Sequence, residues 1–268
     1  MFISDYHIHS SFSADSKENL DDIIERAIEI GLQEIAITDH YDLDSPQEQE
    51  GFILDIPRYF KKLQEAKESY KDKIDIKVGI EIGSQPQIYD DLNLLVDSYD
   101  WDFVLSSLHT VDRTDVAFPL FFAEKTREEA HNRYFEAVLD SVERFKNYSV
   151  MSHLDFITRY GGKEYRHMDL AKHWDIIDEI LKKIISSNRG IEINTSGFRY
   201  GEDRTYPSDE ILKRYFKLGG EIVTVGSDAH KKEDLCRDFD RVYDFLESIG
   251  VKYISSFKNR EVSFKKFR

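Results

Sequence analysis

Short apolar segments alternate with longer segments of helical period along the whole chain. Seven runs rich in β-branched and other apolar residues predict β-strands, and an eighth run, at Val251 to Ser255, fits the strand pattern less well. The seven predicted strands are Phe2 to Tyr6, Glu34 to Thr38, Ile76 to Ile82, Phe103 to Ser106, Ser149 to Ser152, Ile191 to Asn194 and Ile222 to Val225. This alternation is typical of repeated β-α units that form a parallel sheet.

Between the strands, apolar residues recur at steps of three and four, which predicts amphipathic helices. The first helix is expected to end before Gly31, and its apolar stripe consists of Leu20, Ile23, Ile24, Ala27 and Ile28. Thr126 and Glu129 predict a capping box at the start of a long helix after the fourth strand. A further helix is predicted from the apolar positions between Leu170 and Ile184.

A parallel sheet must be covered on both faces or closed into a barrel, and near-continuous apolar strands suit either outcome. No linker rich in Pro, Gly or Ser, no internal repeat and no charge block divides residues 1–268. We therefore expect a single α/β domain, a barrel of about seven β-α units, in preference to a doubly wound open sheet.

The composition narrows the class of protein. Of the 268 residues, 40% are hydrophobic, 33% are charged and only five are proline, so a full apolar core is expected and disorder is not. With 52 Asp and Glu against 37 Lys and Arg, the net charge of −15 disfavours broad binding to nucleic acid or to an anionic membrane. The single cysteine, Cys236, and the lack of a signal-peptide pattern after Met1 predict a cytoplasmic protein. An anionic substrate would need a local source of positive charge.

Histidines and carboxylates follow the predicted strands near the point where each strand ends. His7 and His9 lie two residues apart, so their side chains leave the strand on the same face and can converge on one metal ion. Taken alone, such a pair of histidines is weak evidence for a metal site. The pattern is repeated at later strand ends, by Asp39 with His40, Glu81, His109, His153, and Asp228 with His230.

In a parallel barrel these strand ends form one rim, so the residues would meet at a single site. Six of the nine histidines lie there, while the strand interiors stay apolar. The tendency of His and Asp to occupy hydrated strand ends explains one or two of these positions, but it explains the whole set poorly. Mixed imidazole and carboxylate ligands favour Zn, Mn or Fe over Mg or Ca. His131, His167 and His173 are expected to be ordinary surface residues.

In order and spacing, these residues resemble the motifs of the polymerase and histidinol phosphatase (PHP) family. The resemblance extends over nearly the whole chain. The matching segments are Asp5 to Ser10 with Phe12, Ser13 and Asp15, Ile37 to His40, Gly79 to Glu81, Ser106 to His109, Ser152 to Asp155, and Gly226 to His230. Within the family, the stretch Ser107 to Asp112 and the loops that carry Arg159 and Arg199 are similar to the monofunctional L-histidinol-phosphate phosphatases.

The resemblance implies a distorted (β/α)7 TIM-like barrel with three divalent metal ions, Zn, Mn or Fe, at its rim. In many family members a histidine stands where this chain has Asp15. The implied ligands are His7, His9, Glu81 and Asp228 for the first ion; Glu81, His109 and His153 for the second; and Asp15, His40 and His230 for the third.

The resemblance also implies hydrolysis of L-histidinol phosphate to L-histidinol and inorganic phosphate in histidine biosynthesis, through attack by a hydroxide that bridges the first two ions. Arg159 and Arg199 are expected to bind phosphate oxygens, although their positions in loops would fit solvated surface charges equally well. Either Asp228 or His230 is expected to protonate the departing alkoxide.

Two other functions remain open. The first is a PHP-type phosphoesterase that acts on short nucleotides or another small phosphomonoester. A long nucleic-acid substrate is disfavoured, because the sequence has no basic stripe. The other is a non-catalytic binding module with a degraded metal centre, which is disfavoured because every aligned ligand position holds a competent ligand. The expected partner is a small phosphorylated metabolite, with no nucleic acid and no membrane, and the oligomeric state is open.

Overall fold

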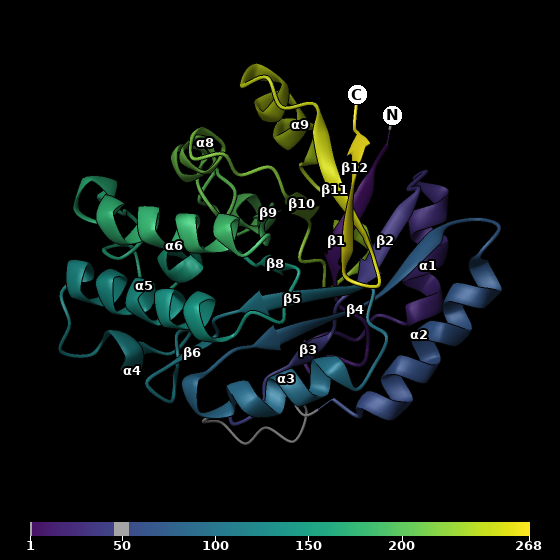
Figure 1. The fold of residues 1–268 in the computed structure, drawn as a ribbon, viewed down its shortest axis with the longest axis horizontal. Helices are drawn as coiled ribbons and strands as arrows, with labels where there is room; N and C mark the ends of the chain where they lie inside the picture. Colours follow the sequence, from purple (N-terminus) through teal and green to yellow (C-terminus); the bar gives the residue numbers. More distant parts are fainter. Residues whose placement is uncertain (1, 46–53) are drawn as a thin grey trace.

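The computed structural model describes residues 2–45 and 54–268. Within these residues, the main sheet has eight strands, and seven of them run parallel in the order β1-β2-β4-β5-β8-β9-β10 (Figure 1). Their bounds are β1 Ser4–Ile8, β2 Glu34–Ile37, β4 Asp75–Gly83, β5 Phe103–Ser107, β8 Val150–Met151, β9 Gly190–Asn194 and β10 Val223–Gly226. All seven predicted strands are confirmed, with ends that differ by a few residues at most.

The first and last strands of the sheet meet at their carboxyl ends. Ile8 and Ala229 form a parallel bridge, and the backbone N–H of His9 donates to the carbonyl oxygen of Ala229 at 2.9 Å. The sheet is therefore a nearly closed, distorted (β/α)7 barrel, as predicted, rather than a doubly wound open sheet.

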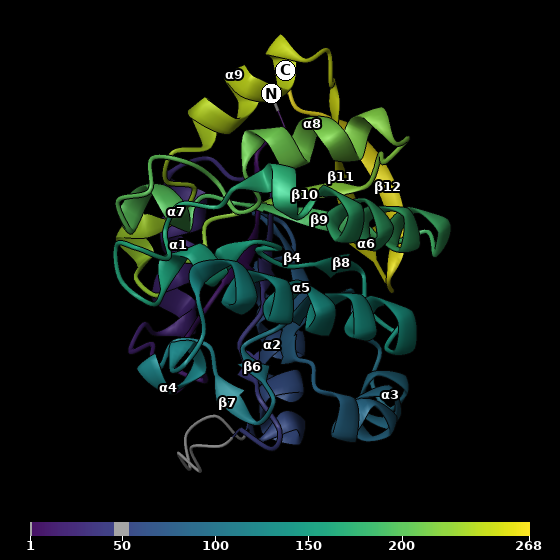
Figure 2. The same cartoon turned by 90° about the vertical axis from the view of Figure 1, so that its left-hand side faces the viewer.

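Helices surround the barrel in the two views of Figures 1 and 2. The capping box is confirmed, because the Thr126 side chain accepts from the Glu129 N–H while the Glu129 side chain accepts from the Thr126 N–H. The helices are α1 Leu20–Glu29, α2 Ile56–Tyr70, α3 Tyr89–Asp97, α4 Pro119–Phe122, α5 Arg127–Arg144, α6 Trp174–Ser186, α7 Ser196–Arg199, α8 Asp209–Lys217 and α9 Phe239–Ser248, with 3-10 turns η1 Pro86–Ile88, η2 Phe156–Arg159, η3 Leu170–Lys172 and η4 Lys232–Asp234. In the described part of the chain, no helix is both long and apolar enough to cross a membrane.

The weak eighth strand pattern belongs to a hairpin outside the barrel. Strands β11 (Tyr253–Lys258) and β12 (Glu261–Lys266) pair antiparallel. Phe257 packs against Phe103, with 5.1 Å between ring centroids, and its N–H donates to the Tyr6 hydroxyl. The hairpin therefore lies outside the barrel, away from the carboxyl ends of the strands, and contributes Phe257 to the apolar cluster that contains Tyr6 and Phe103.

Three short strands follow the carboxyl ends of barrel strands. Strand β3 (His40–Tyr41) pairs with the end of β4, and β6 (Thr110–Val111) forms a hairpin with β7 (Thr114–Asp115) directly after β5. A shift in the pairing of β1 with β2 occurs between Asp5 and Ile8. Such an irregularity re-aims side chains, and it places His7 and His9 at the open end of the barrel while Tyr6 packs inside.

Two expectations about individual residues are wrong. The strand interiors are not uniformly apolar, because β4 contains the buried Lys77 and β9 contains the buried Glu192. His131 and His173 are also buried, whereas His167 is exposed as predicted. His131 lies on the inner face of α5, where its Nε2 contacts the carbonyl oxygen of Tyr165 at 2.9 Å and burial lowers its pKa to about 4.

Candidate metal centre and active site

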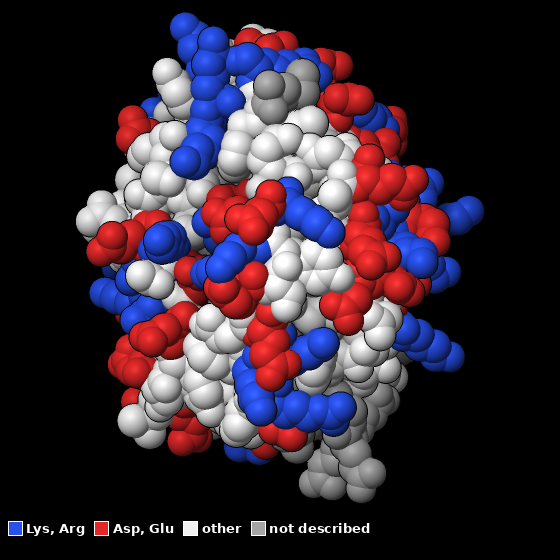
Figure 3. Space-filling model, turned by 90° about the vertical axis from the view of Figure 1, so that its right-hand side faces the viewer, with Lys and Arg blue, Asp and Glu red and all other residues white. Residues whose placement is uncertain are grey.

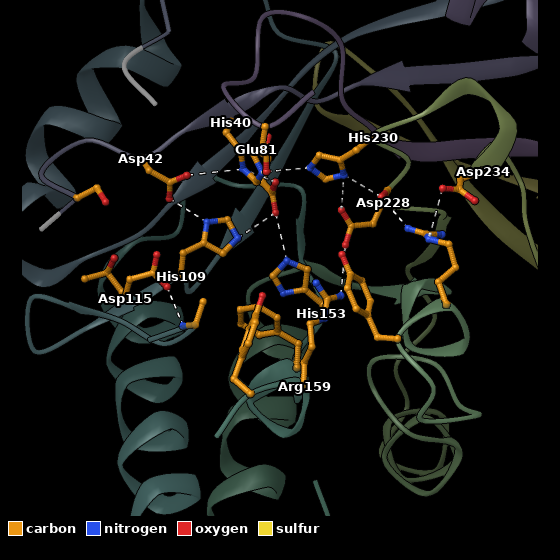
Figure 4. Close-up of a pocket in the computed structure, with 18 of the residues that line it drawn as sticks. His40, Asp42, Glu81, His109, Asp115, His153, Arg159, Asp228, His230 and Asp234 are labelled. Carbon is orange, nitrogen blue, oxygen red and sulfur yellow. Dashed lines mark hydrogen bonds and ion pairs between the residues drawn. The ribbon is translucent and has the colours of Figure 1, made fainter. Parts of the chain in front are cut away.

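The carboxyl ends of the barrel strands surround an open cavity of about 580 Å³. All nine predicted metal ligands lie at this end of the barrel, and we call this set of side chains the cup. Its members are His7, His9, Asp15, His40, Glu81, His109, His153, Asp228 and His230. Seven of them line the cavity, and His7 and His9 are fully buried behind these. Figure 4 labels His40, Glu81, His109, His153, Asp228 and His230 among them.

Glu81, at the end of β4, is the centre of the cup. Its Oε2 lies 3.2 Å from Nε2 of His7, 3.5 Å from Nε2 of His9 and 2.8 Å from Nδ1 of His40. Its Oε1 lies 3.4 Å from Nε2 of His109 and 3.2 Å from Nε2 of His153. One fully buried carboxylate thus faces five imidazoles from four segments of the chain, which is the arrangement expected of a bridging metal ligand.

Asp228 follows strand β10 and faces two of the imidazoles that also face Glu81. Its Oδ1 lies 3.8 Å from Nε2 of His7 and 3.5 Å from Nε2 of His9. The same oxygen lies 3.6 Å from Nδ1 of His230. His7 and His9 therefore each lie within 4 Å of both Glu81 and Asp228.

The residues predicted for the third ion lie at the mouth of the cup. Asp15 Oδ2 is 3.1 Å from Nε2 of His230 and 3.6 Å from Nε2 of His40. The Asp15 side chain is 43% exposed, whereas those of His230 and His40 are 28% and 11% exposed. The third site is thus more open to solvent than the space around Glu81.

Hydrogen bonds fix the orientation of His9. The ring Nδ1 of His9 lies 3.1 Å from the Ser13 hydroxyl, which donates to Asp39 Oδ1 at 2.7 Å and accepts from the His40 N–H. Because the Ser13 hydroxyl uses its proton on Asp39, His9 must carry its proton on Nδ1 and turn Nε2 toward the cup.

Glu192 was missed by sequence reasoning. It lies in β9, and its Oε1 is 2.6 Å from Nδ1 of His7. Its Oε2 accepts from the Ser152 hydroxyl at 2.7 Å and from the His153 N–H at 2.9 Å. A carboxylate that holds the far nitrogen of a metal-binding imidazole fixes its tautomer and raises its basicity. A glutamate inside an otherwise apolar strand was the available signal.

Asp42 was missed as well. Its Oδ1 lies 2.8 Å from Nδ1 of His109, and its Oδ2 lies 3.6 Å from Nδ1 of His40. The carboxylate also passes close to the backbone at Gly83, where a Cβ would lie 1.8 Å from Asp42 Oδ1. Any larger residue at position 83 would therefore displace the Asp42 carboxylate. The signal in the sequence was the two-residue step from His40, the same step that links His7 to His9.

The donor set of the cup fits divalent metal ions. Nε2 of His7, Nε2 of His9 and Oε2 of Glu81 are all buried without a hydrogen-bond partner in the described part of the chain. Unpaired buried acceptors are costly in a protein interior, and a cation between them would satisfy all three. In two groups, His7 with His9 and Glu81, and Glu81 with His109 and His153, the potential ligand atoms lie within 4.8 Å of one another.

The charges of the cup support the same interpretation. Burial disfavours the ionised form of Glu81, but His7 and His40 outweigh burial and hold its pKa well below the usual value. Burial likewise opposes protonation of His7, yet Glu192 and Glu81 raise the pKa of His7 well above its usual value. Protons on imidazoles therefore compensate the carboxylates when no cation does, and they compete with metal binding as the pH falls.

Both predicted phosphate-binding arginines line the cavity. Arg159 donates from Nη2 to the Ser196 hydroxyl, and this atom lies 3.5 Å from Asp228 Oδ2. Arg199 donates from Nη2 to the carbonyl oxygen of Asp228 at 2.8 Å. Nε of Arg159 and Nη1 of Arg199 have no hydrogen-bond partner among the described residues. Both guanidinium groups therefore have a donor left for an anion.

Comparison with known proteins agrees with the geometry. Residues 5–196 match the PHP domain. The chain is 34% identical over 263 residues to the histidinol-phosphatase of Lactococcus lactis, an alignment that covers 98% of this chain and 97% of that protein. The chain belongs to the PHP family. Within this family, a probable histidinol-phosphatase of Clostridium acetobutylicum is 31% identical over 252 residues, with 93% of this chain and 95% of that protein covered.

A solved structure of the PHP family shares the fold. It is the crystal structure of histidinol phosphate phosphatase from Lactococcus lactis, complexed with zinc, L-histidinol and phosphate. The TM-score is 0.89 at 33% identity, over 97% of this chain and 98% of that chain. The PHP-type barrel is thereby confirmed, and the roles of individual cup residues stay predictions.

Proposed function

We propose that this protein is a metal-dependent phosphomonoesterase that hydrolyses L-histidinol phosphate to L-histidinol and inorganic phosphate in histidine biosynthesis. The observation that carries the proposal is the position of Glu81, amid five imidazoles and beside a cavity that Arg159 and Arg199 also line. Similarity to the Lactococcus lactis enzyme over nearly the whole chain supports the choice of substrate. The single cysteine fits a cytoplasmic location, and residues 1–268 are proposed to form one domain.

We propose three divalent ions in the cup, as zinc or as manganese or iron. Such ions, when bound, generate a hydroxide nucleophile near neutral pH and neutralise phosphate oxygens. They would also supply the positive field that the net charge of −15 lacks. His7, His9, Glu81 and Asp228 would hold one ion; His109 and His153, with Glu81, a second; and Asp15, His40 and His230 the third.

The chain's own side chains orient the substrate and move the proton. Arg159 and Arg199 would grip phosphoryl oxygens through their unused N–H groups, since both lie beside Asp228. The leaving alkoxide needs a proton, and the candidate donors are Asp228, whose Oδ2 lies 3.5 Å from Nη2 of Arg159, and His230, whose Nδ1 lies 3.6 Å from Asp228 Oδ1. His230 is the more exposed of the two and can exchange its proton with solvent.

Substitution of either arginine by methionine is expected to lower kcat/KM for L-histidinol phosphate by about 10-fold or more, because a charged donor to the phosphoryl group is lost while most of the side-chain bulk remains. Lysine at position 159 should restore only part of the loss, since it cannot donate from two fixed nitrogens. Steady-state kinetics provide the measurement. Arg144→Met, on the outer surface of α5, is the matched control and should leave kcat/KM unchanged. Unchanged kinetics in both cavity variants would show that neither arginine binds the phosphoryl group.

A substrate panel tests the proposed function. Phosphate release is measured for L-histidinol phosphate, a nucleoside monophosphate and p-nitrophenyl phosphate. We expect kcat/KM to be highest for L-histidinol phosphate by about 10-fold or more, because its polar groups would be paired in the cavity. Acidic and basic side chains are interspersed on the face shown in Figure 3, as expected for a small substrate. Preference for the nucleotide would contradict the proposal, and bound metal without turnover of any ester would indicate a binding module.

A further inference from the structure

The outer strand of the carboxyl-terminal hairpin has one edge that no other strand covers. Among the described residues, β12 pairs with β11 alone, and Figure 2 shows β12 on the outer side of the hairpin. All six residues of β12 are exposed, whereas the middle four residues of β11 are buried. The backbone N–H and C=O groups along the outer edge of β12 are therefore open to another strand.

The side chains of β12 divide into an apolar face and a charged face. Val262 and Phe264 are 38% and 46% exposed, and they share one face because alternate residues of a strand point the same way. Glu261, Ser263 and Lys265 share the other face. An exposed edge strand that carries apolar side chains is a site to which a strand of another chain can add.

The sequence of β12 is self-complementary about Ser263. If a second copy of β12 lies antiparallel, with the two Ser263 residues opposite each other, Glu261 lies opposite Lys265. In the same register, Val262 lies opposite Phe264. Opposite charges and apolar pairs directly across two strands both stabilise a sheet, and twofold symmetry forms each of these pairs twice.

The neighbouring symmetric registers do not give these pairs. Antiparallel strands related by a twofold axis keep each face of the sheet continuous only when one residue faces its own copy. With Phe264 at the axis, Lys265 would lie opposite Ser263. With Val262 at the axis, Glu261 would lie there instead. The register centred on Ser263 is therefore the one that pairs charge with opposite charge and apolar with apolar.

The charges of the hairpin are compatible with this pairing. Neither Glu261 nor Lys265 has an ion pair among the described residues, so both can pair with a second chain. Beyond these pairs, Arg260 would approach a lysine of the second copy, but its guanidinium lies 3.7 Å from Asp97, which compensates its charge. Residues 251–268 contain six Lys or Arg and one Glu in a chain of net charge −15, so the acidic remainder of a second copy attracts this segment.

We propose that β12 pairs antiparallel with β12 of a second copy of this chain, with Ser263 on the twofold axis, so that the two hairpins form one continuous sheet. The interface lies away from the cup, so it joins two copies without contributing to the site of hydrolysis. A single pair of short strands buries little surface, and the dimer is therefore expected to be in reversible equilibrium with the monomer.

A charge-swap series tests the pairing of Glu261 with Lys265. Glu261→Lys and Lys265→Glu each place like charges opposite one another twice in the dimer, and each should raise its dissociation constant by about 10-fold or more. The double variant Glu261→Lys/Lys265→Glu exchanges the two charges and should restore the wild-type constant. Sedimentation velocity over a series of protein concentrations provides the measurement, and circular dichroism checks that each variant is folded.

Disulfide cross-linking tests the register. Ser263→Cys would place two thiols opposite each other at the axis, where the Cα atoms of paired strands lie within the range that a disulfide needs. Under oxidising conditions, a covalent dimer should form and disappear on reduction. Ser69→Cys, exposed on α2, and wild-type protein, whose only cysteine is Cys236, should not be cross-linked in this way.

Lys252→Glu is the matched control for the charge swaps. Lys252 is exposed and directly precedes β11, so the variant has the same change in net charge as Lys265→Glu and should keep the wild-type dissociation constant. Four results would each overturn the inference: a monomeric wild-type protein, a dimer that both single swaps leave intact, a double variant that stays dissociated, or no cross-link in Ser263→Cys. None of them bears on the proposed function, because β12 lies away from the cup.

Discussion

Replacing Glu81 by glutamine is expected to lower kcat for L-histidinol phosphate by about 1,000-fold or more, because the shared negative charge at the centre of the cup is removed. Its two oxygens face His7, His9 and His40 on one side and His109 and His153 on the other. An amide cannot bridge two cations in this way. Elemental analysis of the purified variant should show fewer bound ions, together with the loss of turnover.

Glu34→Gln is the matched control for Glu81. Glu34 is also a buried glutamate of the barrel, but it pairs with Lys77 and accepts from Ser256, at the end of the barrel away from the cup. The control is expected to change the melting temperature and to leave kcat and metal content near wild type. Turnover that survives in Glu81→Gln, or that falls equally in both variants, would remove Glu81 from the centre of the mechanism.

Asp228→Asn is expected to lower kcat on the order of 100-fold or more, because it weakens a metal ligand and removes a candidate proton donor. The carboxylate lies within 3.8 Å of His7, His9 and His230, and within 3.5 Å of Arg159. The backbone of Asp228 has φ of 55°, a conformation that asparagine also tolerates. The loss should therefore come from charge rather than from misfolding, and circular dichroism checks this.

The exposed Asp203 gives a matched control for Asp228. It also has a positive φ, of 52°, and its carboxylate pairs with Arg241 outside the cavity. Asp203→Asn should keep wild-type kcat and metal content. If Asp228→Asn were as active as this control, Asp228 would have neither of its two proposed roles.

The barrel and the position of the cup were predictable because each depends on local patterns. Strand period, helical period and the glycine after α1 identify the β-α units, and parallel packing then brings all strand ends to one rim. His7, Glu81 and Asp228 needed only this topology to be placed together. The hairpin of β11 and β12 has the same strand period as the barrel strands, so the pattern alone could not place it outside the barrel.

The supporting carboxylates were harder to find because their partners are remote in sequence. Glu192 contacts His7 from 185 positions away, and Asp42 contacts His109 from 67 positions away. Neither pair lies in one motif, so only the folded barrel brings them together. His131 was expected at the surface, but it shares the buried face of α5 with Ala130 and Tyr134.

Metal titration tests the central claim, that the cup is a trinuclear centre for phosphomonoester hydrolysis, most directly. Protein stripped with a chelator is titrated with zinc, manganese or iron while hydrolysis of L-histidinol phosphate is followed. We expect no turnover without metal and activity that rises until about three equivalents are bound. Full activity in metal-free protein, or saturation of activity at a single equivalent, would contradict it.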